Sequence, residues 1–538
     1  MSLSIPLLDL IIIIVYLMGI VALGIYTSRN MRSTATGYFL AGRSLRWPVI
    51  GAALFASNIS TIHLVGLAAS GYNEGLAWGN YEWMATFTLI LLGIIFAPFY
   101  FKSKIATLPE FLERRYGGAS RSFLAFMGII GALFIHIGMS LYAGAAVFDQ
   151  FFGIDVLTSI LIISTLTALY TVLGGLKAVV VTETIQTVIL IGGAIVVTIF
   201  AVKALPDHGI HTVAELKASL KPRQLSMIHG DNTQGLGWYA VLLGYPVIGI
   251  WYWCTDQTIT QRVLGAKTQY DAQAGPLFAG LLKILPVFIM VLPGVIAYVL
   301  FRDKIGEDAN QTFPVLITEL IPTGLKGLIS AALLAALMST IAAALNSCAT
   351  LIAVDIFGRI RPKTSEIGLI RVGRISAIGI MILAMAWSTQ AGRYSSIFEA
   401  INAIAASLAP GITTVFVFGV FWKRGTKQAG LTTLIFGFTL GVIIFLCDLP
   451  VIGDERLLTD GWGIGLLMQA WWSFLLCSVF YVTISYLTAP PSLASIEGLI
   501  WDNPMDIITK GEFKGLGDIR LLAGGLFLLM IILYTLIQ

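Results

Sequence analysis

Long apolar segments separated by short polar ones run along the whole chain. A helix needs about 20 apolar residues to cross the hydrocarbon core of a bilayer, and the segments of this length predict about fourteen membrane-spanning helices. The predicted spans are residues 8–27, 47–72, 80–101, 120–151, 154–174, 179–203, 235–256, 274–301, 323–358, 367–392, 395–421, 427–446, 463–488 and 519–537. The longest hydrophilic pieces, 203–234 and 489–518, are too short for a core of their own. The pattern therefore predicts an all-α polytopic membrane protein made of one transmembrane domain.

Composition agrees with this pattern. Of the 538 residues, 57% are hydrophobic and only 12% are charged, whereas soluble domains are about 25% charged. The first apolar stretch has no basic region before it, so we interpret it as a retained span and not as a signal peptide. The four cysteines fit neither a zinc site nor a disulfide framework. No phosphate-binding loop, dinucleotide fingerprint or nucleic-acid tract is present, and no nucleophile–base pair or metal cluster indicates an enzyme.

Basic residues gather in alternate loops. Arg43 and Arg46, Arg114 and Arg115, and Arg359 follow one another on the same predicted side, whereas loops 73–79 and 152–155 contain none. The excess of Lys and Arg in cytoplasmic loops places this side in the cytoplasm and both termini outside it. The loop 203–234 is basic as well, but long loops obey the rule less well. We expect a multi-pass protein of the cell (plasma or inner) membrane, with the lipid bilayer as its surroundings.

The predicted span 47–72 carries a polar run in its middle. Ser57, Asn58, Ser60, Thr61 and His63 stand where a lipid-facing helix has Leu or Val. A helix breaks at membrane depth only where protein or a cavity surrounds the freed backbone groups, and small polar residues suit a discontinuous helix that lines a site. Packing against other helices is the alternative for the serines. Asn58 and His63 together favour a binding site.

Other polar groups interrupt apolar spans. Glu82 begins the third span, Lys283 lies well inside 274–301, and Asn402 lies in 395–421. Charged groups at membrane depth usually indicate function, although Glu82 at an interface wetted from outside is the alternative. We expect a polar cavity or a carboxylate partner for Lys283, because its ammonium lies too far from the span ends to reach water easily.

Two further groups have alternative interpretations. The aromatic run Trp251-Tyr252-Trp253 is typical of a membrane interface, but flat aromatic faces beside hydrogen-bonding groups also suit a sugar ring. The hydroxyls of Ser339 and Thr340 serve either helix packing or a hard cation, which prefers oxygen ligands.

Several motifs, in this order and spacing, resemble the sodium:solute symporter family, and most closely its sodium/glucose cotransporter branch. The resemblance runs from about Asp9 to Arg424 and is weaker over the last three spans. The motifs are Phe55-Ala56-Ser57-Asn58-Ile59, Tyr81-Glu82-Trp83, Gly174-Gly175-Leu176-Lys177-Ala178-Val179, Trp251-Tyr252-Trp253-Cys254-Thr255-Asp256-Gln257, Ala343-Ala344-Leu345-Asn346-Ser347 and Phe421-Trp422-Lys423-Arg424.

The resemblance implies an inverted five-helix repeat whose two first helices are broken at the bilayer midplane. The repeats would cover about 47–203 and 235–421, with one span before them and three after. It also implies a set of sugar contacts: Asn58, His63, Glu82, Tyr252, Trp253, Lys283 and Asn402. Leu67, Tyr81 and Phe398 would cover the sugar from outside, and Tyr252 would form the inner gate.

The implied sodium site combines carbonyl oxygens of Ala56, Ile59 and Ala336 with the hydroxyls of Ser339 and Thr340. Glu183 replaces the Asp that is usual in the family. Some relatives bind a second sodium near that Asp, so Glu183 is a candidate second sodium ligand and two sodium ions per sugar are expected. Pairing of Glu183 with a cation such as Lys177 is the alternative. Asn402 for the usual Gln, and Ala85 for a Ser in a known bacterial galactose transporter, bear on the choice of sugar.

The function that follows is sodium-coupled symport of a neutral, glucose- or galactose-like monosaccharide into the cell by alternating access. A carboxylate substrate would require a membrane-buried Arg or an open positive site. The sequence indicates no such Arg in the interior of a span, and beyond Arg121 at its start the 120–151 span offers His136 as its one basic side chain. Other solutes of this fold, such as inositol, sialic acid or proline, are the main alternative, and a sugar-gated sensor or channel is another. We expect no nucleic acid and no obligatory protein partner.

Overall fold

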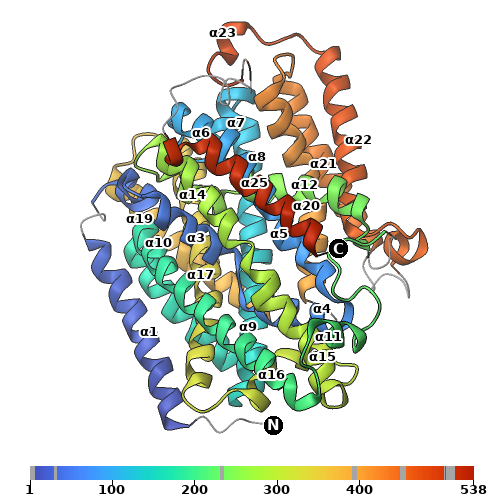
Figure 1. Cartoon of the computed structure of the whole chain (residues 1–538). Helices are drawn as coiled ribbons and strands as arrows, with labels where there is room; N and C mark the ends of the chain where they lie inside the picture. The colour runs from blue at the N-terminus through green and yellow to red at the C-terminus, as the bar shows by residue number, and fades with distance from the viewer. Residues whose placement is uncertain are drawn as a thin grey trace.

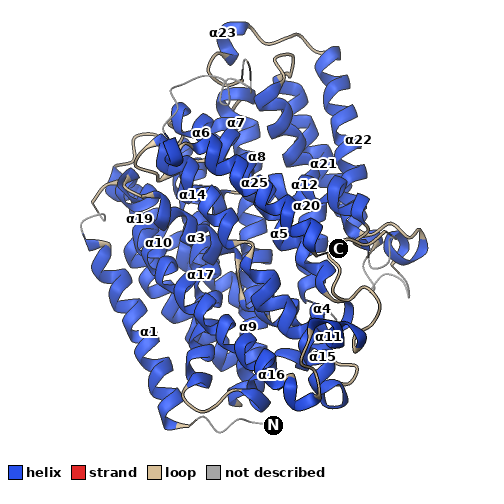
Figure 2. Cartoon of the chain, in the orientation of Figure 1, coloured by secondary structure: helices blue, strands red, loops and turns tan. Residues whose placement is uncertain are grey.

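The computed structural model describes residues 6–29, 33–230, 235–389, 397–448, 456–501, 503 and 515–537. For residues 150–152 and 397–400 the description covers the backbone alone. Helices make up almost all of the regular structure, and these ranges contain two isolated β-bridges but no strand (Figure 2). The long helices lie side by side, as expected of a bundle that fills a membrane (Figure 1).

The helices follow one another with short connections. They are α1 (Leu7–Thr27), α2 (Ala35–Leu40), α3 (Trp47–Asn58), α4 (Thr61–Glu74), α5 (Asn80–Leu91), α6 (Ala97–Ser103), α7 (Leu108–Tyr116), α8 (Gly118–Gly131), α9 (Ser140–Phe152), α10 (Val156–Ala204), α11 (Val213–Ala218), α12 (Trp238–Gly249), α13 (Gln257–Leu264), α14 (Gln269–Leu282), α15 (Leu292–Ile305), α16 (Thr312–Leu320), α17 (Leu325–Thr350), α18 (Gly358–Ile360), α19 (Glu366–Ser388), α20 (Ile397–Phe421), α21 (Lys427–Cys447), α22 (Leu466–Leu487), α23 (Leu493–Ile496) and α25 (Ile519–Leu536). Segments of π-helix, such as Ala132–Met139 and Ile250–Thr255, continue several of them.

Within the described ranges, eleven helices are long and apolar enough to cross a membrane, or twelve if the bent pair α3 and α4 is one span. The predicted number of fourteen is not confirmed. One reason is that the predicted spans 154–174 and 179–203 form a single element, α10.

The chain reverses direction inside α10 at Gly174-Gly175. Gly175 has φ 61° and ψ −161°, which is outside the helical region and in a region that L side chains rarely adopt. A Cβ atom at Gly24 of α1 would lie 3.0 Å from Tyr170 Cβ and 3.4 Å from Thr182 Cγ2. Twelve residues of straight helix would separate these two by about 18 Å. The two halves of α10 therefore lie against the same point of α1 and form a helical hairpin.

The first broken helix is the pair α3 and α4, which meet at 63°. Ile59 and Ser60 between them have extended backbone angles. Ser60 and His63 form a capping box at the start of α4, in which the His63 Nδ1 accepts a hydrogen bond of 3.2 Å from the Ser60 amide. The polar run thus supplies the partners that a helix start requires. The break predicted at Asn58 is confirmed.

A second break lies at Asp256, between the π-helical segment Ile250–Thr255 and α13. Asp256 is extended, with φ −79° and ψ 129°. Its Oδ1 accepts hydrogen bonds from the amides of Thr258 at 2.7 Å and Ile259 at 3.3 Å, which caps α13. The chain thus has two discontinuous helices, as the resemblance implies.

The start of α1 and the end of α25 each contact a connection between other helices. Asp9 near the start of α1 accepts hydrogen bonds from the Gly324 amide at 2.8 Å and the Gly327 amide at 2.6 Å, before and within α17. Ile537 after α25 accepts one of 3.1 Å from the Met227 amide, in the connection that precedes α12. The start of α1 therefore contacts the segment that leads into α17, and the end of α25 contacts the connection that leads into α12. Their position outside the cytoplasm stays a prediction.

Candidate functional site

A cavity of about 110 Å³ lies where the two broken helices approach each other. This is enough space for several water molecules. Its lining is mixed: apolar side chains surround a group of hydrogen-bonding ones. All seven residues predicted to contact a sugar line it: Asn58, His63, Glu82, Tyr252, Trp253, Lys283 and Asn402.

A buried ion pair forms one wall of this cavity. Lys283 directly follows α14, where the helix turns, and its Nζ lies 2.5 Å from Glu82 Oε2 in the first turn of α5. The same ammonium donates to Asn58 Oδ1 at the end of α3. The Lys283 side chain is 1% exposed and that of Glu82 is 4% exposed. The pair therefore supplies donors and acceptors to the cavity without giving it a net charge.

Aromatic side chains form the wall that faces this pair. The Lys283 ammonium lies 5.4 Å from the centroid of the Trp253 ring, within the range of a cation–π contact. Tyr252 accepts a hydrogen bond of 3.1 Å from Asn58 Nδ2. Asn58 thus bridges Lys283 and Tyr252 and joins three elements of the site.

The predicted gate residues occupy different places. Tyr81 lines the cavity and stacks on Trp78, with ring centroids 5.7 Å apart and planes 15° apart. Leu67 is fully buried in a hydrophobic cluster and is not part of the cavity lining. Phe398 belongs to α20, but its side chain lies outside the described residues. Tyr252 lines the cavity as predicted.

The predicted sodium ligands converge beside the first break. Ser339 Oγ lies 2.7 Å from the Ala56 carbonyl oxygen and 2.9 Å from that of Ala336. Thr340 Oγ1 lies 3.5 Å from the Ile59 carbonyl and 3.2 Å from that of Ala336. Five uncharged oxygens from α17 and the broken helix therefore come together, which is the donor set that a hard monovalent cation prefers. Their role in binding sodium stays a prediction.

Glu183 forms an ion pair, but Lys177 is not its partner. Lys177 Nζ contacts Ser44 Oγ at 3.3 Å. Glu183 pairs with Arg262 of α13, with 3.2 Å between Nε and Oε2 and a second contact between Nη2 and Oε1. Ser57 Oγ also donates to Glu183 Oε1 at 3.0 Å. Neither side chain of the ion pair is exposed. A second sodium at Glu183 is not tested by these contacts.

The expectation of no membrane-buried Arg is wrong. Arg262 has no exposed surface. The sequence places it six residues after Asp256, where a polar stretch indicates a loop, but the helix α13 carries it into the bundle. Its charge is used by Glu183, and Arg262 is not among the residues that line the cavity. Among the described residues that line it, the cavity therefore offers no free guanidinium to a carboxylate substrate.

Sequence reasoning missed His136 as a contact residue. It lies in the π-helical segment Ala132–Met139, and such segments are frequent at functional sites. Its ring lines the cavity 5.8 Å from the Tyr252 ring, and its buried Nε2 has no hydrogen-bond partner among the described residues. Ser140 and Tyr245 line the cavity as well. The signal in the sequence was a single His in an apolar span, which by itself is more typical of packing.

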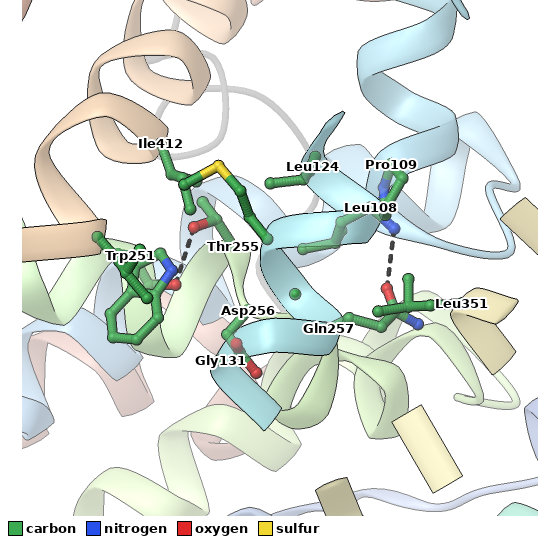
Figure 3. Close-up of a pocket in the computed structure, with 13 residues that line it drawn as sticks. Leu108, Pro109, Leu124, Gly131, Trp251, Thr255, Asp256, Gln257, Leu351 and Ile412 are labelled. Carbon is green, nitrogen blue, oxygen red and sulfur yellow. Dashed lines mark hydrogen bonds between the residues drawn. The ribbon is translucent and has the colours of Figure 1, made fainter. Parts of the chain in front are cut away.

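A second, smaller pocket of about 20 Å³ lies beyond Trp251, which lines both (Figure 3). In Figure 3, Trp251 and Ile412 stand on one side of it and Leu108 with Pro109 on the other. Gln257 Oε1 accepts a hydrogen bond of 2.9 Å from the Leu108 amide, which ties α13 to the first turn of α7. This pocket lies on the side of the basic loops, because α7 contains Arg114 and Arg115.

Comparisons with known proteins agree with the resemblance in the sequence. A model of the sodium:solute symporter family matches residues 38–437. The chain is 34% identical over 542 residues to sodium/myo-inositol cotransporter 2 of Oryctolagus cuniculus, which covers 93% of this chain and 80% of that protein. It is 37% identical to sodium/glucose cotransporter 1 of Ovis aries (81% and 71% covered) and 36% identical to a sodium/mannose cotransporter of Bos taurus (92% and 89% covered).

Solved structures share the fold. A Na⁺-coupled sialic acid symporter in a substrate-bound, outward-open state matches with a TM-score of 0.75 and 21% identity, covering 90% of this chain and 99% of that one. The transporter Mhp1 of the nucleobase-cation-symport-1 family matches with a TM-score of 0.54 and 13% identity, covering 87% and 98%. The fold is therefore the inverted five-helix repeat with broken first helices. The repeat boundaries near 47–203 and 235–421 stay predictions.

Proposed function

Because this chain belongs to the sodium:solute symporter family, we propose that it carries a neutral hexose into the cell together with sodium. Sodium-coupled symport is the activity of the family and of the cotransporter relatives, and the chain is a membrane transporter, not an enzyme. The proposal concerns the solute, the direction of transport and the residues that bind.

One observation carries the choice of solute: the cavity is rich in hydrogen-bonding groups and has no net charge from its Lys283–Glu82 pair. A sugar offers several hydroxyls, each of which donates and accepts. The Glu82 carboxylate accepts from such hydroxyls and the Lys283 ammonium donates to them, and bonds to charged groups are the stronger ones. Trp253 and Tyr252 present aromatic faces to the apolar C–H side of a ring.

The cation is proposed to act through the broken helix. Sodium bound between the carbonyls of Ala56 and Ile59 and the hydroxyls of Ser339 and Thr340 would hold the end of α3 and the start of α4 against α17. Asn58 lies within this segment and contacts the solute cavity, so the cation orders a solute ligand. Release of sodium on the cytoplasmic side loosens the same segment, and the solute leaves through the pocket beyond Trp251. This is alternating access driven by differential affinity.

A cyclic polyol is the second candidate solute. Sodium/myo-inositol cotransporter 2 of Oryctolagus cuniculus is about as similar to this chain as the glucose and mannose cotransporters are. Inositol also has a ring with hydroxyls around it, so the neutral cavity suits it for the same reasons. Asn402 in place of a longer Gln leaves more room on the α20 side of the cavity.

Uptake into proteoliposomes tests the proposal. The panel is glucose, galactose, mannose, myo-inositol, proline and sialic acid, each with an inward sodium gradient and with potassium in place of sodium. We expect a hexose to accumulate only in the presence of the sodium gradient. Uptake of proline or sialic acid without competition by any hexose contradicts the hexose assignment. Sodium-dependent currents without solute accumulation would instead indicate a sugar-gated sensor or channel.

A further inference from the structure

The buried pair of Glu183 and Arg262 lies directly beside the candidate sodium site. Ala56 gives its carbonyl to that site, and the next residue, Ser57, donates its hydroxyl to Glu183 Oε1 at 3.0 Å. Glu183 belongs to the second half of α10, and Arg262 belongs to α13, the inner part of the second broken helix. A buried carboxylate requires a partner of opposite charge. Because Glu183 lies beside the first cation site, its carboxylate is a candidate ligand for a second cation.

The carboxylate of Glu183 already has its partners. Arg262 contacts both of its oxygens, Oε2 through Nε at 3.2 Å and Oε1 through Nη2. Ser57 takes a further position on Oε1, and the remaining Arg262 nitrogen, Nη1, donates to the Thr258 carbonyl. Two parallel contacts of this kind fix both groups in one geometry. The hydroxyls of Ser339 and Thr340 contact the carbonyls of the first cation site, so among the described hydrogen bonds Ser57 is the one hydroxyl that reaches the carboxylate of Glu183.

The charges of the pair also argue against a second sodium ion at Glu183. Glu183 and Arg262 carry one negative and one positive charge, and neither has exposed surface. A sodium ion added there would have to share the carboxylate with the guanidinium, and the two cations would repel each other at short range. The first cation site consists of carbonyl and hydroxyl oxygens with no fixed cation among them, so a single sodium ion meets no such repulsion there.

We propose that the guanidinium of Arg262 takes the place of a second sodium ion beside Glu183, so that one sodium ion is transported per solute. The proposal rests on sodium-coupled uptake of a neutral solute as proposed above. It replaces the two-ion expectation derived from the sequence with the alternative in which Glu183 pairs with a cation, and it identifies that cation. Arg262 is a positioning residue in this scheme: it touches neither the solute cavity nor the oxygens of the sodium site.

A balance-point measurement in proteoliposomes tests this. At zero membrane potential, an inward sodium gradient of about tenfold holds a neutral solute at about tenfold accumulation if one ion is coupled, and at about a hundredfold if two are coupled. Vesicles preloaded with solute at tenfold excess should therefore show no net flux. Net uptake until about a hundredfold is reached overturns the proposal. If no solute of the panel shows sodium-dependent uptake, the proposed function fails instead, and the two failures are distinguishable.

Charge-neutral substitution separates an internal ion pair from an ion site. Glu183→Gln and Arg262→Gln each leave one buried charge unpaired and should abolish uptake. The double substitution removes both charges and leaves two amides that can hydrogen-bond, so no buried charge stays unpaired and uptake should return with the balance point still near tenfold. A double variant that reaches the membrane and binds solute but shows a lower balance point than the unmodified protein would show that Glu183 carries a transported ion. If the variants do not reach the membrane, the balance point of the unmodified protein decides alone.

Discussion

Two buried ion pairs in the bundle differ in whether a solute can reach their hydrogen-bonding groups. Lys283 and Glu82 line the cavity, and their contacts extend to Asn58 and the Trp253 ring. Arg262 and Glu183 lie outside the cavity lining and contact each other, Ser57 and Thr258. The first pair can exchange a contact for a solute hydroxyl, whereas the second has its contacts outside the cavity lining, where no solute reaches it. The same combination of charges thus serves recognition in one place and structure in the other.

The choice of cation follows this difference. Lysine carries a compact charge with three rotatable donors, and this lets its ammonium serve Glu82, Asn58 and a ligand in turn. Arginine presents a rigid fork that matches a carboxylate in one geometry. The contacts of Arg262 with both oxygens of Glu183 use that fork fully. The two roles therefore require a lysine in the cavity and an arginine in the buried pair with Glu183, which is called the sealed pair below.

Breaking the sealed pair should have the largest effect on stability. Removing one partner of a buried ion pair costs about 3–5 kcal/mol, because the other charge stays buried without compensation. We expect Arg262→Gln to lose about that much stability against thermal unfolding in detergent. The control is Arg114→Gln, which breaks an exposed pair with Glu110 and should cost at most about 1 kcal/mol. Equal effects of the two changes would mean that the sealed pair is not structural.

Changing the carboxylate of the cavity pair should affect recognition. Glu82→Gln keeps the shape but replaces a charged acceptor, whose hydrogen bond is worth about 1.5–3 kcal/mol. We expect the solute concentration for half-maximal uptake to rise by more than about tenfold. The control is Glu319→Gln, which removes a partly exposed partner of Lys304 and should leave uptake unchanged. An unchanged affinity in the Glu82 variant would contradict the assignment of this cavity to the solute.

Removing hydroxyls from the candidate cation site should change the sodium dependence without involving either ion pair. Ser339→Ala and Thr340→Ala should each raise the sodium concentration for half-maximal uptake by about tenfold, the loss of one ion contact of about 1.4 kcal/mol. Thr340→Ser keeps the oxygen and should be mild. Ser330→Ala is a control on the same helix, because that hydroxyl bonds to the Lys326 carbonyl of its own helix. If both alanine variants keep the normal sodium dependence, these hydroxyls serve packing.

The smallest expected effect concerns His136. Its buried Nε2 has no partner among the described residues, so a solute hydroxyl would satisfy it. His136→Phe keeps a ring beside Tyr252 and removes a neutral hydrogen bond worth about 0.5–1.5 kcal/mol. Solute affinity should fall by about two- to thirteenfold with sodium dependence unchanged. His211→Phe in an exposed loop is the control, and equal affinity of the two variants would leave His136 without a role in recognition.

Sequence reasoning was most successful where membrane physics leaves few alternatives. Spans must be long and apolar, so their positions follow from length. The polar run at Asn58 favoured a break, because a bilayer cannot satisfy free backbone groups and small polar residues can. Two of the cavity residues, Glu82 and Lys283, were found for a similar reason, since a charged side chain at membrane depth costs several kcal/mol unless it has a partner or a polar cavity. Their mutual contact and the roles of Asn58 came from the resemblance and the structure together.

The remaining features depend on contacts between distant segments. Arg262 stands in a stretch that is polar enough for a loop, and its burial follows from the position of α13 against α10. The pairing partner of Glu183 is 79 residues away, which no local pattern indicates. The number of spans is not confirmed, partly because the two halves of α10 form one continuous helical element with only a tight turn at Gly175 between them. His136 could be proposed as a solute contact only once the cavity was known, because its ring lines that cavity and its Nε2 has no partner among the described residues.

The tight turn at Gly174-Gly175 also has a consequence for how the protein is made. With no loop between them, the two halves of α10 cannot cross the bilayer one after the other at independent times, so the insertion machinery must accept them as one hairpin. Lys177 follows the turn directly and contacts Ser44, and its charge keeps the tip of the hairpin at the basic face. A bulky residue at Gly175 would meet the Tyr38 carbonyl, 2.5 Å from where its Cβ would lie. Such a change would therefore act during biogenesis, and its mark would be a lower amount of inserted protein with normal transport by each molecule that is inserted.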